Sequence, residues 1–154
     1  MTAILQKISR ASVTADGEPY SECGKGFLIL LGVSVDDSEE DARLLADKIS
    51  KIRVFEDEND KMNLSVNDVG GTVMVVPNFT LLAAYKKGNR PAFIYSAEPG
   101  RAEELFCYFC DYIKDIVPDV KRGKFRSHME VSLINDGPVT IPLDSRVLRG
   151  ERSI

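Results

Sequence analysis

The sequence contains 154 residues, 44% of them hydrophobic, and carries a formal net charge of -4. This length and composition suit a single compact domain with one core of ordinary size. The negative charge argues against a protein that coats nucleic acid indiscriminately, because such binding needs many Lys and Arg side chains to neutralise phosphates.

The sequence also bears on the cellular compartment. The longest apolar stretch, residues 27–31, is far too short to span a bilayer, and the first residues lack a basic stretch followed by an apolar run. Three cysteines are an odd number and suggest no disulfide framework, which fits a reducing compartment. We expect a cytoplasmic protein with no membrane segment.

The first half of the chain predicts two strands and a helix. Residues 3–14 often alternate apolar with polar positions, which predicts a strand ending at the turn Asp16-Gly17. Residues 26–33 form an apolar run bracketed by glycines, typical of a central strand buried on both faces. Ser38 is a good N-cap for a helix that begins with three acidic residues and continues to residue 52.

The second half predicts further strands and a second helix. Residues 72–76 predict a strand that Pro77 stops, and a helix with one apolar stripe should begin near Pro99 and end at Pro118. A strand over residues 129–134, a turn over 135–138 and a strand stub over 139–141 follow. Because strands outnumber the two main helices and do not alternate with them regularly, we predict an α+β fold.

Two small groups of residues resemble reactive sites. Cys107 and Cys110 have the C-x-x-C spacing of redox and zinc sites, but they lie mid-helix, and Cys23 is distant in the sequence. His128 is the single histidine and follows Ser127. On a strand these two side chains would point to opposite faces, so they would not form a nucleophile and base. We interpret both groups as structural and expect no metal or cofactor.

Two basic stretches, residues 86–90 and 121–126, contain no acidic residue. Each alone is as consistent with a solvated loop as with a binding site. Together they favour a phosphate-facing rim and an RNA partner. The candidate contacts are Lys86, Lys87, Arg90 and Lys124.

The segment Asn-Asp-Gly-Pro at residues 135–138 is, on local chemistry alone, a hairpin turn. A Gly-Pro bond also exposes two unhindered carbonyl oxygens, and a cis bond would aim both the same way. Two parallel carbonyls can hold an ammonium group. The residues themselves leave both interpretations open.

Long ordered blocks of the sequence resemble the D-aminoacyl-tRNA deacylase family. The blocks include Phe79-Thr80-Leu81, Lys-Lys-Gly-Asn-Arg-Pro at residues 86–91, and Val-Ser-Leu-Ile-Asn-Asp-Gly-Pro-Val-Thr at residues 131–140. The resemblance implies a homodimer whose domain, residues 1–148, has mixed, mostly antiparallel, barrel-like sheets in β-β-α layers with two main helices. A charged tail, residues 149–154, would follow.

The resemblance also implies an activity and a chiral filter. The reaction would be hydrolysis of the ester that joins a D-amino acid, or glycine, to tRNA, as a form of proofreading. Gly137 and Pro138, joined by a cis bond, would enter the partner subunit's pocket, hold the substrate amino group and leave no room for an L side chain. Asn135 and Lys7 would belong to this filter.

The same resemblance implies that Asn78, Phe79 and Thr80 form the catalytic segment. Backbone N–H groups of Phe79 and Thr80 would stabilise the oxyanion that forms when the ester carbonyl is attacked. The resemblance assigns Thr80 no covalent role.

Three residues depart from the family pattern. Pro77 and Asn78 stand where serine and glutamine are usual, and Lys7 replaces an arginine whose rigid fork a lysine does not supply. These departures leave two alternatives open. One is a relaxed editor that removes a small L-amino acid from tRNA, and the other is a tRNA-binding protein of this fold without turnover.

Overall fold

The computed structural model describes residues 1–151. In chain order its elements are β1 (Thr2–Ala15), β2 (Glu18–Cys23), β3 (Gly26–Gly32), α1 (Glu39–Lys51), β4 (Phe55–Glu56), β5 (Met62–Leu64), β6 (Thr72–Pro77), the 3-10 helix η1 (Phe79–Leu82), α2 (Pro99–Lys114), β7 (Asp119–Arg122), β8 (Met129–Asp144) and α3 (Ser145–Leu148). None of the helices within this range is long and apolar enough to cross a membrane.

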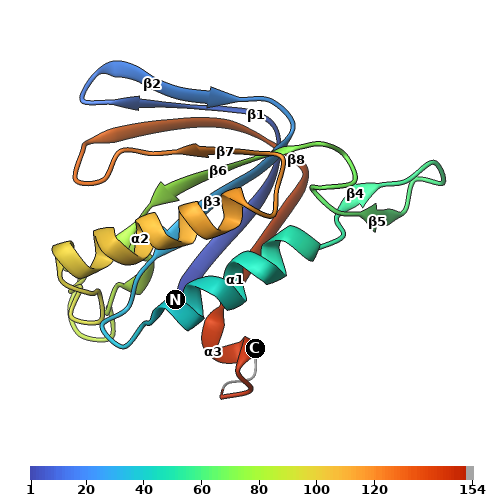
Figure 1. Cartoon of the computed structure of the whole chain (residues 1–154). Helices are drawn as coiled ribbons and strands as arrows, with labels where there is room; N and C mark the ends of the chain where they lie inside the picture. The colour runs from blue at the N-terminus through green and yellow to red at the C-terminus, as the bar shows by residue number, and fades with distance from the viewer. Residues whose placement is uncertain (152–154) are drawn as a thin grey trace.

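One curved sheet dominates the molecule (Figure 1). Its strand order is β2-β1-β3-β6-β7, and β8 pairs with β1 as well. The β3–β6 and β6–β7 pairings are parallel, whereas β1 pairs antiparallel with β2, β3 and β8. The Ser21 hydroxyl of β2 donates to the Arg122 carbonyl of β7 at 3.0 Å, so the two sheet edges approach each other. The predicted α+β fold with mixed, mostly antiparallel, barrel-like sheets is confirmed.

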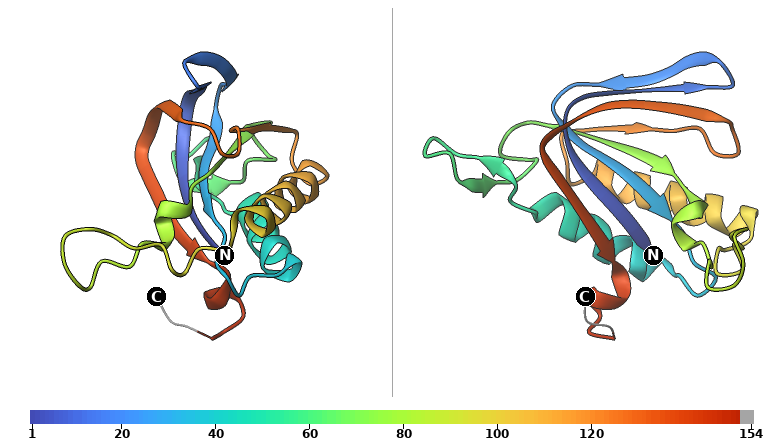
Figure 2. Two further views of the ribbon diagram at one scale, coloured as in Figure 1. Left: turned by 90° about the vertical axis from the view of Figure 1, so that its left-hand side faces the viewer. Right: turned by 180° about the vertical axis from the view of Figure 1, so that it is seen from behind.

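Two apolar cores lie on opposite sides of β3. Both α1 and α2 lie along one side of the sheet (Figures 1 and 2), and the larger core includes Phe27 and Ile29 of β3. Leu28 faces the smaller core, together with Ile8 and Met74. Because successive strand residues face opposite sides, β3 is buried on both faces, as its continuous apolar run predicted.

The start of α1 anchors the end of the described chain. Ser38 and Asp41 form a capping box, in which the Ser38 N–H donates to Asp41 Oδ2 at 2.9 Å. The other carboxylate oxygen accepts from Ser145 Oγ at 2.6 Å and from the Arg149 guanidinium. Arg149, the first residue of the predicted charged tail, therefore packs against the domain. Residues 152–154 of that tail lie outside the described residues.

The environment of Asp41 predicts how stability depends on pH. Burial alone would raise its pKa, but hydrogen bonds from Ser145 and Ser38 outweigh burial and hold the pKa below 3.8. A carboxyl with a depressed folded-state pKa stabilises the fold above its unfolded pKa and loses that contribution as pH falls through the folded pKa. We therefore expect the free energy of unfolding to fall as pH drops below about 4.

The variant D41N tests this assignment. It should lower the free energy of unfolding by about 1–2 kcal/mol at pH 7, because hydrogen bonds to a neutral acceptor are weaker than those to a carboxylate. The difference from the native protein should narrow as the pH is lowered, and urea unfolding measured at both ends of the range shows it. A difference that stays constant with pH would assign the acid sensitivity to other groups.

Two predicted boundaries were wrong. Helix α2 ends at Lys114 rather than at Pro118, because the chain turns earlier, with the Asp115 N–H bonding to the Tyr112 carbonyl at 3.2 Å. Residues 135–141 are not a turn with a strand stub, since β8 runs without interruption over Met129–Asp144. Both flanks of this segment pair with the same strand, β1, so the chain continues in one direction instead of reversing.

Candidate active site

The segment Asn135 to Thr140 forms a bulge in β8. Gln6 of β1 pairs with Thr140, and Ile8, two residues further along β1, pairs with Asn135, five residues away along β8. The extra length makes a protrusion of residues 136–139, the Gly-Pro bulge. Its Gly137-Pro138 bond is cis, and both residues are exposed. Pro138 offers no N–H to a neighbouring strand, which suits an interruption of the ladder.

The Asn135 side chain closes the Gly-Pro bulge at its base. Its Nδ2 donates to the Val139 carbonyl at 3.1 Å and to Thr140 Oγ1 at 3.3 Å. The other side-chain atom, Oδ1, is buried and has no hydrogen-bond partner among residues 1–151. The Val139 side chain is buried in the larger core. These contacts leave only the tip of the bulge exposed.

Lys7 lies on β1 opposite the Gly-Pro bulge and is only 1% exposed. Its Nζ bonds to both carboxylate oxygens of Glu56 at 2.7 Å and lies 3.8 Å from Asp136 Oδ2. The hydrogen bond from Lys7 is the main reason that the pKa of Glu56 lies below its usual 4.5. Nothing near Lys7 in the sequence indicates Glu56 as its partner, because Glu56 lies 49 residues away, on β4.

The predicted catalytic segment is the turn of 3-10 helix η1. Asn78 caps it: the Asn78 N–H donates to the Leu31 carbonyl at 2.8 Å, and its Oδ1 accepts from the Thr80 N–H at 3.2 Å and from the Thr80 hydroxyl. Of the two predicted oxyanion donors, Thr80 N–H is therefore engaged. The Phe79 N–H has no protein acceptor within the described residues.

The surroundings of Phe79 are apolar. A small pocket of about 60 Å³ is lined there by Leu31, Val33, Pro77, Asn78, Phe79, Ala102, Phe106 and Phe125. A larger hollow of about 640 Å³ lies elsewhere, across β1, β2 and β8, and includes Arg10, Glu22 and Ser132. Of these two hollows, the small pocket adjoins the catalytic segment.

The Gly-Pro bulge and η1 are separated by three strand spacings of the sheet. Gln6, at the edge of the bulge, pairs with Leu28 of β3, whereas Leu31 of β3 pairs with Pro77, just before η1. The path crosses from β8 over β1 and β3 to β6 and runs three residues along β3, which together amount to roughly 15 Å or more. One chain therefore does not bring the two predicted parts of the site together.

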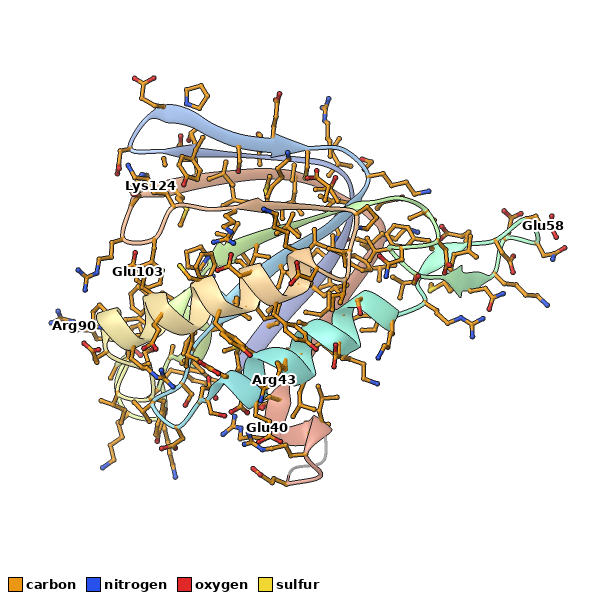
Figure 3. All side chains as sticks on the ribbon, in the orientation of Figure 1. Glu40, Arg43, Glu58, Arg90, Glu103 and Lys124 are labelled. Atoms are coloured by element: carbon orange, nitrogen blue, oxygen red, sulfur yellow. The ribbon has the colours of Figure 1, made fainter. Side chains whose placement is uncertain are left out.

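The two basic stretches differ in their surroundings. Residues 86–90 have no ion pair within residues 1–151, whereas Lys121, Arg122 and Lys124 each pair with an acid, which for Lys124 is the distant Asp16. Lys124 in particular lies 3.6 Å from Asp16. Arg90 and Lys124 lie on different segments on the same side of the molecule (Figure 3). Spacing along the sequence does not reveal such neutralisation.

The cysteine pair has no feature of a reactive site. Cys107 and Cys110 are free thiols within α2, and burial raises the pKa of Cys110 to about 12. A thiol with such a pKa stays protonated at neutral pH and is a poor nucleophile and metal ligand. The packing interpretation of this pair is therefore supported.

The prediction that Ser127 and His128 lie on a strand was wrong. Ser127 and His128 lie in the bend before β8, not on a strand, because Arg126 adopts a positive φ of 58° and turns the chain. The His128 N–H donates to Asp16 Oδ1 at 3.1 Å, and the Asp16 N–H donates to the His128 carbonyl at 2.8 Å. His128 thus extends the pairing of β1 with β8 by one residue beyond Ala15 and Met129.

Two solved structures share the α+β fold of this chain. A solved structure titled "c-Myc DNA Unwinding Element Binding Protein" superposes with a TM-score of 0.88 at 39% identity and covers 94% of this chain and 98% of that chain. The structure of a probable eukaryotic D-amino acid tRNA deacylase shares the fold, with a TM-score of 0.81 at 16% identity, covering 94% of this chain and 100% of that chain.

The family assignment follows from sequence. The sequence pattern of the D-Tyr-tRNA(Tyr) deacylase family matches residues 4–144, so the chain belongs to this family. It is 49% identical over 146 residues to a D-aminoacyl-tRNA deacylase of Caldicellulosiruptor saccharolyticus, covering 95% of this chain and 98% of that protein. It is 52% identical over 146 residues to the D-aminoacyl-tRNA deacylase of Thermodesulfovibrio yellowstonii, covering 95% of this chain and 100% of that protein.

Proposed function

We propose that this protein hydrolyses the ester bond of D-aminoacyl-tRNA in the cytoplasm, releasing the D-amino acid and reusable tRNA. The observation that carries the proposal is the exposed tip of the Gly-Pro bulge, which Asn135 and Lys7 hold at its base. The family match over residues 4–144 includes both this bulge and η1.

The bulge acts as the chiral filter. The carbonyl oxygens of Gly137 and Pro138 accept hydrogen bonds from the substrate α-ammonium group, and the bulge occupies the space that an L side chain would need. The two enantiomers are discriminated because the steric clash of an L side chain with the bulge weakens binding more than its other contacts strengthen it. Glycine has no side chain and passes the same filter.

The site is composite and belongs to a homodimer. Since roughly 15 Å or more separates the bulge from η1 within one chain, each bulge enters the site of the other subunit. Sedimentation should therefore give a mass of about twice the chain's 17.1 kDa. A monomer with full activity would contradict the composite site.

At η1 the chain supplies backbone donors to the reaction. Water adds to the ester carbonyl and gives up a proton while the carbonyl oxygen becomes an oxyanion. The C–O bond to the ribose then breaks, and the ribose oxygen takes up a proton, so that overall the OH of water goes to the amino acid and its other hydrogen to the tRNA. The Phe79 N–H is free to stabilise the oxyanion, and the Thr80 N–H joins it when it leaves Asn78 Oδ1. Positively charged side chains at residues 86–90 hold the tRNA backbone.

A Thr80 variant distinguishes backbone from side-chain catalysis. The Thr80 hydroxyl donates to Asn78 Oδ1, and no carboxylate or histidine among residues 1–151 accepts from it. Without a base it is not an activated nucleophile. T80V should therefore keep kcat/KM within about threefold of the native value, whereas loss of a general base or nucleophile costs about a hundredfold or more. A loss of that size would assign Thr80 a covalent or proton-transfer role.

Three substrates test the proposed specificity. D-tyrosyl-tRNA and glycyl-tRNA should lose their amino acid with the pure protein, while L-alanyl-tRNA should persist. Equal loss of L-alanyl-tRNA would show the relaxed editor that the Pro77 and Lys7 departures left open. Persistence of all three, with tRNA still bound, would show a binding protein without turnover.

A further inference from the structure

The segment 83–97 forms an exposed loop beside η1. Ala84 and Ala92 exchange two backbone hydrogen bonds, at 2.7 and 2.9 Å, and so close the loop into a narrow hairpin. Figure 2 shows the loop, yellow-green in the left view, extending away from the body of the molecule. Tyr85 is 79% exposed, and Ile94 and Tyr95 are also exposed. Large apolar side chains at such exposure commonly mark a binding surface.

The 83–97 loop is attached directly to the catalytic segment. The Phe93 ring packs edge-on against the Phe79 ring, with centroids 4.8 Å apart. Ser96 Oγ donates to the Phe79 carbonyl at 3.2 Å. A ligand held by the loop is therefore held close to the free Phe79 N–H.

The charge of the 83–97 loop is opposite to that of the whole chain. Residues 83–97 contain Lys86, Lys87 and Arg90 and no acidic residue, although the net charge of the chain is -4. These three cations form no ion pair with any residue that the structure describes, unlike Lys124. The positive charge of the loop therefore favours binding of a polyanion over binding of a peptide without acidic residues.

We propose that the 83–97 loop is a stacking platform for the unpaired nucleotides at the 3′ end of the RNA substrate. The Tyr85 ring stacks on a base, while Lys86, Lys87 and Arg90 contact phosphates. An aromatic face next to cations is how proteins bind single-stranded nucleic acid, since bases in a duplex are already stacked. Stacking tolerates any base. The inference rests on the proposed function, because the loop would deliver the esterified nucleotide to η1.

Binding of an RNA hairpin that carries no amino acid tests the platform. One hairpin carries four unpaired nucleotides at its 3′ end, and a second is identical but blunt. Y85A should weaken binding to the first hairpin about fivefold, the lower end of the effect of removing one base–aromatic stack. Y85F, which keeps the ring, should bind as the native protein does.

Tyr20 on β2 supplies the matched control, because it is also an exposed tyrosine, at 49%. Y20A should leave binding to both hairpins unchanged. Three results would overturn the platform. They are equal binding of both hairpins by the native protein, binding of the first hairpin by Y85A as tight as that of the native protein, and a loss of affinity in Y85A that is as large for the blunt hairpin as for the first. Because the RNA carries no amino acid, these results do not depend on hydrolysis. A protein that shows no deacylation but needs Tyr85 for binding would refute the deacylase proposal and leave the platform standing.

Discussion

Replacing Gly137 with alanine is expected to reduce kcat/KM for D-aminoacyl-tRNA about a hundredfold, the usual effect of a displacement of about 1 Å in a reacting site. Gly137 has a φ of +123°, and a Cβ there would lie 2.9 Å from Val139 Cγ2 and 3.0 Å from the Val139 nitrogen. An L residue at this φ is strained, so the bulge must change shape to accept alanine. Single-turnover deacylation measures the effect.

Gly17 provides a control with a similar backbone cost. Its φ is +84°, and an added Cβ would meet nothing within 4 Å, far from the bulge in the turn after β1. G17A and G137A should each lose about 1–2 kcal/mol of stability, because both place an L residue at positive φ. Only G137A should lose activity. Nearly native activity of G137A, with normal enantiomer discrimination, would remove the bulge from the mechanism.

Replacing Lys7 with methionine is expected to lower deacylation at least about tenfold while changing stability by only about 1 kcal/mol. Methionine matches the length of the buried Lys7 stem, and the Lys7 Nζ that it removes lies 5.6 Å from the centroid of the Phe55 ring. Glu56 and Asp136 are 45% and 51% exposed, so both carboxylates reach water once the cation is gone. The bulge, however, loses its tether to β1. Thermal unfolding and kcat/KM, measured on one preparation, separate the two effects.

Two further variants identify which contact matters. E56Q keeps the Lys7 contact with Asp136 at 3.8 Å and should retain most activity. K7R restores a cation and supplies two parallel donors, so it should be at least as active as the native protein. If K7M and E56Q lose activity equally, Lys7 would act by organising Glu56 rather than by tethering the bulge.

Local periodicity predicted β1, β3, β6 and the two main helices, but not the sheet strands β2 and β7. The apolar run bracketed by glycines predicted β3, and the Ser38 cap with its acidic first turn predicted α1. Such features depend on neighbours within a turn of helix or along a strand. The boundary at Pro118 was wrong because proline only limits how far a helix can extend, and α2 stops earlier.

The form of the site depended on contacts distant in sequence. Residues 135–138 have turn chemistry, but whether the chain reverses depends on β1, which pairs with both flanks and so produces a bulge. The Lys7 contacts with Glu56 and Asp136 join three separate segments. Likewise, Lys124 looked like a free cation until the fold placed Asp16 beside it. Resemblance named the candidate residues, and the fold showed which partners surround them.

The most direct test of the account compares the two enantiomers on one tRNA. Purified protein is incubated with D-tyrosyl-tRNA and, separately, with L-tyrosyl-tRNA, and the remaining ester is measured over time. The chiral filter predicts rapid loss of the D-ester and persistence of the L-ester at the rate seen without protein. Equal loss of both esters, or loss of neither, would contradict it.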